Sequence, residues 1–155
     1  MRASPSSRSD RGDSGMSDWV SIDCDGRFSA VIDGHAAVNA LHVGDVASQD
    51  QLSELLDQPT VWLKVDGFAD GRGFSVARQL RLQGFTGTIQ VVGDLLPDQL
   101  PMAVESGIDV VLIRAEHAER CEEAQWRERS ADKERFGYQR SVADRRPIGC
   151  RRVAR

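Results

Sequence analysis

The feature that most constrains the fold is a regular alternation of apolar runs and helix-like segments between residues 60 and 114. Three runs predict strands, at Val61–Val65, Thr88–Val92 and Asp109–Ile113. Two segments between them predict helices, at Phe74–Gln83 and Gln99–Ser106. Strands joined through helices by short loops pair in parallel with right-handed crossovers. The pattern therefore predicts a small parallel β-α-β-α-β unit within an α/β protein.

Capping signals sharpen these helix boundaries. Gly84 and Gly107 follow the two helices, where glycine commonly ends a helix in the left-handed conformation. Pro101 is tolerated only in a first turn, so the second helix should begin close to Asp98, acting as its N-cap. Upstream, Ser48 and Gln51 form a capping-box pattern, which predicts a further helix at about Gln49–Asp57.

The segments on either side of this unit predict a β-hairpin and a C-terminal helix. Two strand-like runs, Trp19–Asp23 and Arg27–Ile32, flank Asp25-Gly26, a pair typical of a type I′ turn. Three strands alone would make a small sheet, which this hairpin or a second copy of the chain could extend. Residues 115–138 are charged and helix-prone, with Trp126, Phe136 and Tyr138 as their main anchors.

The composition along the chain predicts three parts. Residues 1–17 contain almost nothing apolar, so a disordered leader is expected. Met16 lies at the end of this leader and is a candidate for the true start. Residues 18–140 are expected to form a single α/β domain around residues 60–114, followed by a disordered basic tail at residues 141–155.

Charge is unevenly distributed along the 155 residues. The net charge is −4, which gives the whole chain no nucleic-acid signature. From Arg114 onward 12 Lys and Arg stand against 8 Asp and Glu, whereas the preceding part has 8 against 16. The basic end could contact an acidic protein or a polyanion, or be a solvated helix with a frayed end.

The cysteine usage and hydropathy favour a cytoplasmic protein that does not enter membranes. The three cysteines are an odd number without pair spacing, which argues against a disulfide framework or a zinc site and favours a reducing compartment. Apolar runs are far too short to cross a bilayer, and the N-terminus lacks the apolar stretch of a signal peptide.

The loop after the first predicted strand of the unit is the first candidate site. Ligands of parallel α/β sheets gather at the carboxyl ends of the strands. Here glycines permit close backbone approach, a helix start attracts anions, and arginines suit carboxylates or phosphates. An anion site would use Asp70, Gly71, Arg72, Gly73, Ser75, Arg78 and Arg81. The alternative is a tight turn in which Asp70 caps the helix and the arginines pair with Asp94 or Asp98.

The loop after the next strand is a second polar cluster, made of Gly93, Asp94, Asp98 and Gln99. Carboxylates at positions i and i+4 suit an acid/base pair or a magnesium ion. Loop caps are the commoner role for such residues, and no metal site is predicted. His117 follows the third strand within charged sequence, where a solvated surface histidine is the simpler interpretation.

A specific series of residues resembles the bacterial domain-of-unknown-function family 934. The series comprises Asp70-Gly71-Arg72-Gly73-Phe74-Ser75, Ala77-Arg78, Leu80-Arg81, Gly84-Phe85-Thr86-Gly87, Val92-Gly93-Asp94 and Asp98-Gln99. The resemblance covers about Val61 to Ile113, and Phe136 to Gln139 resembles the family's closing segment. The resemblance implies an oxidoreductase or an accessory protein of sulfite reduction. The resemblance therefore implies sulfite reductase or another sulfate-assimilation protein as the partner, and identifies no cofactor and no catalytic residues.

This chain departs from the family pattern at several positions. Gln90 stands where the family usually has Arg, Pro101 replaces a bulky apolar residue, and Glu105-Ser106 replaces an Arg-Cys pair. A thiol mechanism through that cysteine is thereby excluded.

Three alternative functions are compatible with these features. The first is an accessory protein that docks onto sirohaem sulfite reductase or supplies it with electrons, with docking favoured because the sequence has no flavin, haem or iron-sulfur motif. The second is an α/β enzyme that binds a phosphorylated or sulfated small molecule through Arg72, with Asp94 or Asp98 as base. The third is a diverged, non-catalytic interaction module that uses the basic C-terminal segment.

Overall fold

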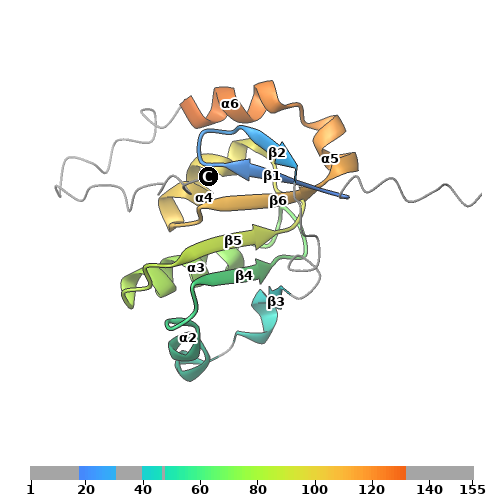
Figure 1. Cartoon of the computed structure of the whole chain (residues 1–155). Coiled ribbons are helices and arrows are strands. Elements are labelled where there is room, and N and C mark those ends of the chain that lie inside the picture. The colour runs from blue at the N-terminus through green and yellow to red at the C-terminus, as the bar shows by residue number, and fades with distance from the viewer. Residues whose placement is uncertain (1–17, 31–39, 47, 132–155) are drawn as a thin grey trace, which may run out of the picture.

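A six-stranded mixed sheet organises the computed structural model, which describes residues 18–30, 40–46 and 48–131 (Figure 1). The strand order is β2-β1-β6-β5-β4-β3. Strands β3 to β6 are parallel, and β1 is antiparallel to both β2 and β6. The strands are β1 Trp19–Asp23, β2 Phe28–Ala30, β3 Leu41–His42, β4 Thr60–Lys64, β5 Thr88–Val92 and β6 Val110–Arg114. The predicted α/β class is confirmed, and the hairpin extends the sheet.

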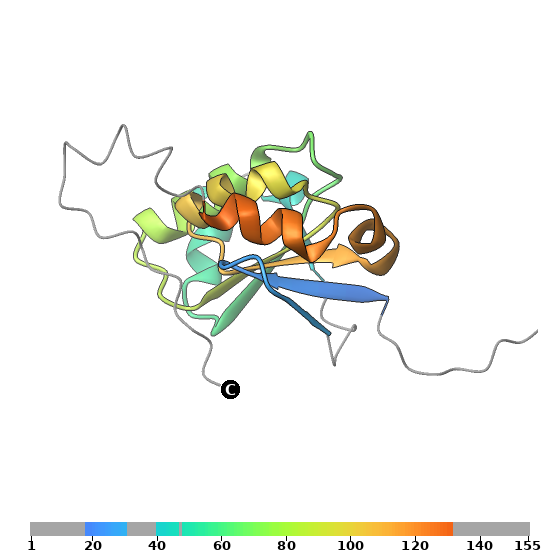
Figure 2. The same cartoon turned by 90° about the horizontal axis from the view of Figure 1, so that it is seen from above.

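Helices α3, α4 and α6 lie on one side of this sheet (Figure 2). The helices are α2 Gln49–Leu55, α3 Arg72–Leu82, α4 Leu100–Ser106, α5 Ala115–Arg120 and α6 Glu123–Ala131, with 3₁₀ turns η1 Val43–Asp45 and η2 Pro97–Gln99. None of these helices is long and apolar enough to cross a bilayer. The predicted leader, residues 1–17, and the predicted tail, residues 141–155, lie outside the described part of the chain.

The alternation of side chains along the strands places the core between the sheet and the helices. Val61 and Leu63 of β4 are buried toward the helices, as are Ile89 and Val91 of β5. The opposite face carries a smaller apolar cluster around Val92 and Leu112, packed against Trp19, Ala40, Trp62 and Val110. The continuous apolar character of β5 thus reflects burial on both faces.

The helix ends follow the capping signals, with one exception. Gly84 and Gly107 have φ of +94° and +96° and end α3 and α4 with the hydrogen-bond pair of a Schellman motif. The Ser48–Gln51 capping box is present at α2. The N-cap predicted at Asp98 is wrong, because Asp98 lies inside the 3₁₀ turn η2 and its side chain binds Arg129.

The hairpin has a different turn from the predicted type I′. Of the two central residues only Gly26 has a positive φ, of +76°, and Asp23 and Arg27 close a three-residue loop. This geometry is typical of a type I turn followed by a bulged glycine. Gly26 also touches α6, because a Cβ there would lie 2.5 Å from the backbone of Trp126.

The C-terminal helical region is two helices within residues 115–131, not the single helix expected. Cys121 adopts a non-helical conformation between α5 and α6. Beyond this break Trp126 is fully buried, donates from Nε1 to the carbonyl of Cys121 at 3.1 Å, and meets Phe28 edge to face. Burial of this large side chain requires α6 to turn back over the sheet. The predicted anchors Phe136 and Tyr138 lie outside the described residues.

Arg81 holds the amino edge of the sheet, where the parallel strands begin. Its side chain is 6% exposed and donates from all five N–H positions. The acceptors are the carbonyls of Phe85, Gly87 and Gly107 and the carboxylate of Asp109, the last at 2.6 Å. Asp109 also accepts from the N–H of Ile89 at 2.8 Å. One guanidinium thus joins the end of α3 to the loops that enter β5 and β6.

Replacing Arg81 by Met should strongly destabilise the protein. The substitution keeps an apolar stem but removes the cationic partner of the Asp109 carboxylate and the donors to three carbonyls, which costs about 3–5 kcal/mol in comparable buried pairs. Urea unfolding followed by far-UV circular dichroism measures the change. Arg78→Met, at an exposed position of the same helix, should change the free energy of unfolding by less than about 0.5 kcal/mol. Equal effects of the two substitutions would contradict the assigned role of Arg81.

Candidate functional site

The carboxyl ends of β3, β4, β5 and β6 form one edge of the sheet, here called the carboxyl edge. The loop from Val65 to Gly71 follows β4, and the loop from Gly93 to Leu96 follows β5. His42 ends β3 beside Lys64 of β4. Both predicted polar clusters therefore begin at this edge, as expected for a parallel sheet.

Two of the candidate glycines at this edge are required by packing. A Cβ at Gly73 would lie 2.6 Å from the Val65 side chain, and one at Gly93 would lie 2.4 Å from the same side chain. Such distances are far inside van der Waals contact. Gly73 therefore allows α3 to approach β4, and Gly93 allows the β5 loop to approach it. At Gly71, by contrast, a Cβ would meet nothing.

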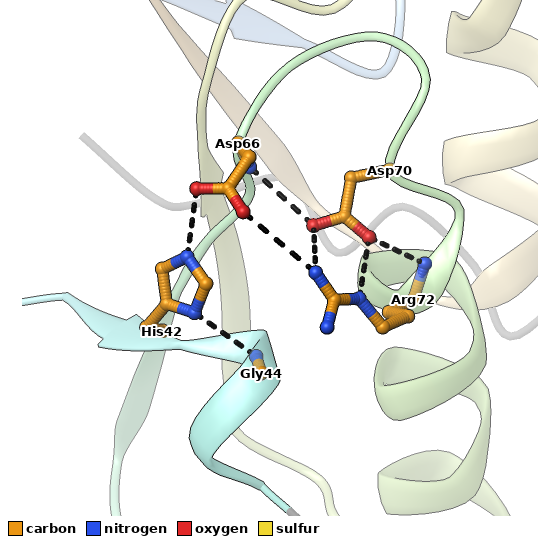
Figure 3. A network of polar contacts seen from close by, with 5 residues as sticks. All are labelled: His42, Gly44, Asp66, Asp70 and Arg72. Atoms are coloured by element: carbon orange, nitrogen blue, oxygen red, sulfur yellow. Dashed lines mark hydrogen bonds and ion pairs between the residues drawn. The ribbon is translucent and has the colours of Figure 1, made fainter.

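Asp70 and Arg72 form a bidentate ion pair at the start of α3 (Figure 3). Arg72 Nε donates to Asp70 Oδ1 at 2.8 Å, and Nη2 donates to Oδ2 at 3.1 Å. The same carboxylate accepts from the backbone N–H groups of Arg72 and Asp66, at 3.2 and 3.4 Å. The hydrogen bonds from the Arg72 side chain are the main cause that lowers the pKa of Asp70 from 3.8 to about 2.

His42 and Asp66 continue this network toward β3 (Figure 3). The Gly44 N–H donates to His42 Nδ1 at 3.1 Å, so that nitrogen carries no proton. His42 Nε2 then donates to Asp66 Oδ1 at 2.8 Å. The other oxygen of Asp66 lies 3.7 Å from Arg72 Nη2. Because both ring nitrogens are engaged, His42 has no lone pair available to accept a substrate proton in this geometry.

Asp70→Asn should lower thermal stability at neutral pH and have little effect in acid. A carboxyl whose pKa is lowered by folding stabilises the native state above its unfolded pKa, 3.8 here. That contribution is lost as the pH falls from about 4 through about 2. Melting curves at neutral pH should show a deficit of a few degrees for the variant relative to wild type, which closes as the pH approaches 2. A deficit that stays constant with pH would show that the Asp70 charge is not its source.

The three polar side chains of the second cluster make four separate interactions. Asp94 Oδ1 accepts from the N–H of Arg114 at 3.4 Å, whereas Asp98 pairs with Arg129 of α6 at 2.6 Å. Gln99 accepts from the N–H of Leu96 at 3.0 Å and donates to the carbonyl of Phe68 at 2.7 Å. Asp94 thus accepts a backbone hydrogen bond from the end of β6, and Asp98 forms an ion pair on the surface with α6. The Gln99 amide connects the β5 loop to the β4 loop.

The remaining candidates on α3 point to different places. Ser75 and Arg78 are exposed along the helix. Arg81 lies at the opposite, amino edge, where its guanidinium is buried and all its donors are used. The structure therefore brings together Asp70, Gly71 and Arg72 with Gln99 nearby through Phe68, and separates Arg81 from them.

Sequence reasoning missed His42, Asp66 and Phe68. His42 and Gly44 lie in a segment with no clear periodicity, although a His two residues before a Gly is suited to a side-chain bond onto a turn N–H. Asp66 directly follows β4, which was a usable signal. Phe68 is 57% exposed at the tip of the β4 loop. An apolar residue within a Gly- and Asp-rich loop gave no indication of its exposure.

The charge balance at Arg72 disfavours a simple anion site. The bonds from Arg72 to Asp70 use Nε and Nη2, so a phosphate or sulfate could reach the remaining nitrogen, Nη1, only beside the carboxylates of Asp70 and Asp66, whose charges repel it. Asp70 also occupies the Arg72 N–H at the start of the helix. Across the described ranges, no group of three His, Cys, Asp or Glu is arranged to hold a metal ion. The arrangement braces a loop, and that loop exposes a large aromatic side chain, Phe68.

Fold and site together define an α/β protein with a braced loop at the carboxyl edge of a mixed sheet. The chain belongs to a family described as bacterial protein of unknown function, DUF934, whose model matches residues 41–149. The match includes β3 and His42, which the resemblance drawn from residues 61–113 did not cover. No curated protein and no solved structure matches the chain.

Proposed function

We propose that this protein is an accessory protein of assimilatory sulfite reduction, which docks onto sirohaem sulfite reductase or another protein of sulfate assimilation. The link to sulfur metabolism comes from the family resemblance. The docking role is supported by one observation above all, the exposed Phe68 held on a braced loop at the carboxyl edge.

The loop around Phe68 is held from both ends and from one side. The Asp70 carboxylate accepts from the backbone N–H groups of Asp66 and Arg72, which stand at the two ends of the loop. The Asp70 N–H donates to the carbonyl of Gly67 at 3.1 Å. Gln99 binds the Phe68 carbonyl from the β5 loop. A loop ordered before binding loses less conformational entropy when a partner contacts it. Exposed aromatic side chains in such positions commonly supply a large part of the binding energy.

A docking role also accounts for the chemistry of the network better than a reaction does. The Arg72 guanidinium is paired with two carboxylates, and both nitrogens of His42 are engaged. A catalytic base needs a free lone pair near its substrate, and an anion bound at Arg72 would be repelled by the two carboxylates beside the guanidinium. These groups instead stabilise the conformation of the loop that presents Phe68.

Purified tagged protein should bind purified sirohaem sulfite reductase from the same host, and Gln99→Ala should weaken that complex by roughly tenfold because the Phe68 loop loses its tie to the β5 loop. Biolayer interferometry measures the affinity. Gln79→Ala removes an exposed amide from α3 and is the matched control, expected to bind like wild type.

Two further observations distinguish docking from electron transfer and test the role in sulfite reduction as a whole. A colourless purified protein that binds the reductase supports docking, whereas a visible absorption band would indicate an electron carrier. If the reductase does not bind and deletion of the gene leaves growth on sulfate unchanged, the sulfite-reduction role is wrong.

A further inference from the structure

Two of the large apolar side chains exposed in the described part of the chain lie at the carboxyl edge. Phe68 is 57% exposed and Met102 is 56% exposed. Gln99, at the start of α4, binds the Phe68 carbonyl, and Met102 follows Gln99 by three residues, which places both on the same side of the helix. The Gln99 bond therefore places the first turn of α4, which carries Met102, beside the loop that carries Phe68.

Two exposed carboxylates flank this apolar region along the chain. Asp66, two residues before Phe68, has a side chain 64% exposed, and Asp98, beside Gln99, has one 72% exposed. Arg72 beside Asp66 and Arg129 beside Asp98 are themselves about half exposed, and the side chain of His42, which binds Asp66, is 32% exposed. Ion pairs between exposed side chains contribute little to stability, so a partner's cations can compete for these carboxylates.

The described part of the chain carries a net negative charge, the same sign as these two carboxylates. Residues 18–30, 40–46 and 48–131 contain 18 Asp and Glu but only 9 Lys and Arg. Helix α5 and the residues after it, which follow β6 at the same edge, add Glu116, Glu119, Glu122 and Glu123 against the two arginines of this stretch, Arg114 and Arg120. The field at this edge attracts basic surfaces and repels acidic ones.

We propose that Phe68 and Met102 form the apolar centre of a docking surface, rimmed by Asp66 and Asp98, for a partner protein that presents an apolar socket within a basic patch. This inference deepens the proposed function, on which its docking role rests, by specifying the partner's surface. Anionic membranes and nucleic acids are repelled by the rim. A second copy of the chain bound through the same surface would place like charges opposite each other.

The two parts of the surface have separable effects on binding. The apolar centre contributes mainly to the lifetime of the complex, since a desolvated aromatic anchor must be withdrawn for dissociation. The rim charges contribute mainly to the association rate, which salt screens. Substitutions of the two kinds should therefore change different rate constants.

The first experiment compares two baits, wild type and Phe68→Ala, in the soluble extract of the host. Proteins recovered by wild type and lost with Phe68→Ala are identified by mass spectrometry, purified and measured by biolayer interferometry. Phe68→Ala should weaken binding by roughly tenfold or more, through faster dissociation. Leu82→Ala is the matched control, because Leu82 is 70% exposed but ends α3 at the opposite edge of the sheet. It should bind within about twofold of wild type.

The second experiment tests the rim. Asp98→Lys should slow association several-fold at low ionic strength, and the difference from wild type should disappear at high salt. Binding that is independent of salt, or insensitive to Asp98→Lys at low salt, would overturn the basic character of the partner surface. Circular dichroism and melting temperatures, unchanged for these exposed substitutions, show that the variants are folded.

The outcomes separate this inference from the proposed function. Recovery of sulfite reductase in equal amounts by wild type and Phe68→Ala would leave the proposed function standing and overturn the Phe68 surface. Recovery of a different, basic protein that depends on Phe68 would support the Phe68 surface and contradict the role in sulfite reduction. Loss of binding after deletion of residues 145–155, with Phe68→Ala binding normally, would assign the contact to the basic C-terminal segment and overturn the inference.

Discussion

The buried pair of Arg81 and Asp109 is the interaction on which the rest of the arrangement depends. A guanidinium with five donors is placed where α3 ends and where the chain enters both β5 and β6, and each donor has an acceptor. Because the Asp109 carboxylate also accepts from the Ile89 N–H of β5, the register of β5 against β6 and the position of α3 are set by one polar cluster. The Schellman glycines at residues 84 and 107 bring the required carbonyls within reach.

Fixing the amino edge has consequences at the carboxyl edge. With the far end of α3 held by Arg81, its first turn must lie against β4, and Gly73 permits that contact with Val65. The short loop that remains is closed by Asp70, which binds the N–H of Asp66 and the side chain of Arg72. The loop therefore has little freedom, and Phe68 at its tip is presented to solvent by a structure that exists before any partner arrives.

The same residue types serve different purposes at the two edges. Arg81 is buried and fully bonded within the fold, whereas Arg72 is mostly exposed and paired with carboxylates at the surface. Both belong to the series that resembles the family, and from the sequence alone both were predicted as candidates for anion binding. Position along α3 separates them, since nine residues of helix carry Arg81 to the other end of the sheet.

Periodicity, turn chemistry and capping residues determined the β-α-β-α-β unit, the capping box at Ser48 and the glycines that end α3 and α4, because these depend on neighbours within a few positions along the chain. Only the tertiary structure decided which strand the hairpin joins, where the helices break around Trp126, and which candidate residues meet. His42 reaches Asp66 across 24 positions and Gln99 reaches Phe68 across 31. Such contacts depend on the packing of the whole sheet, for which no local pattern carries a signal.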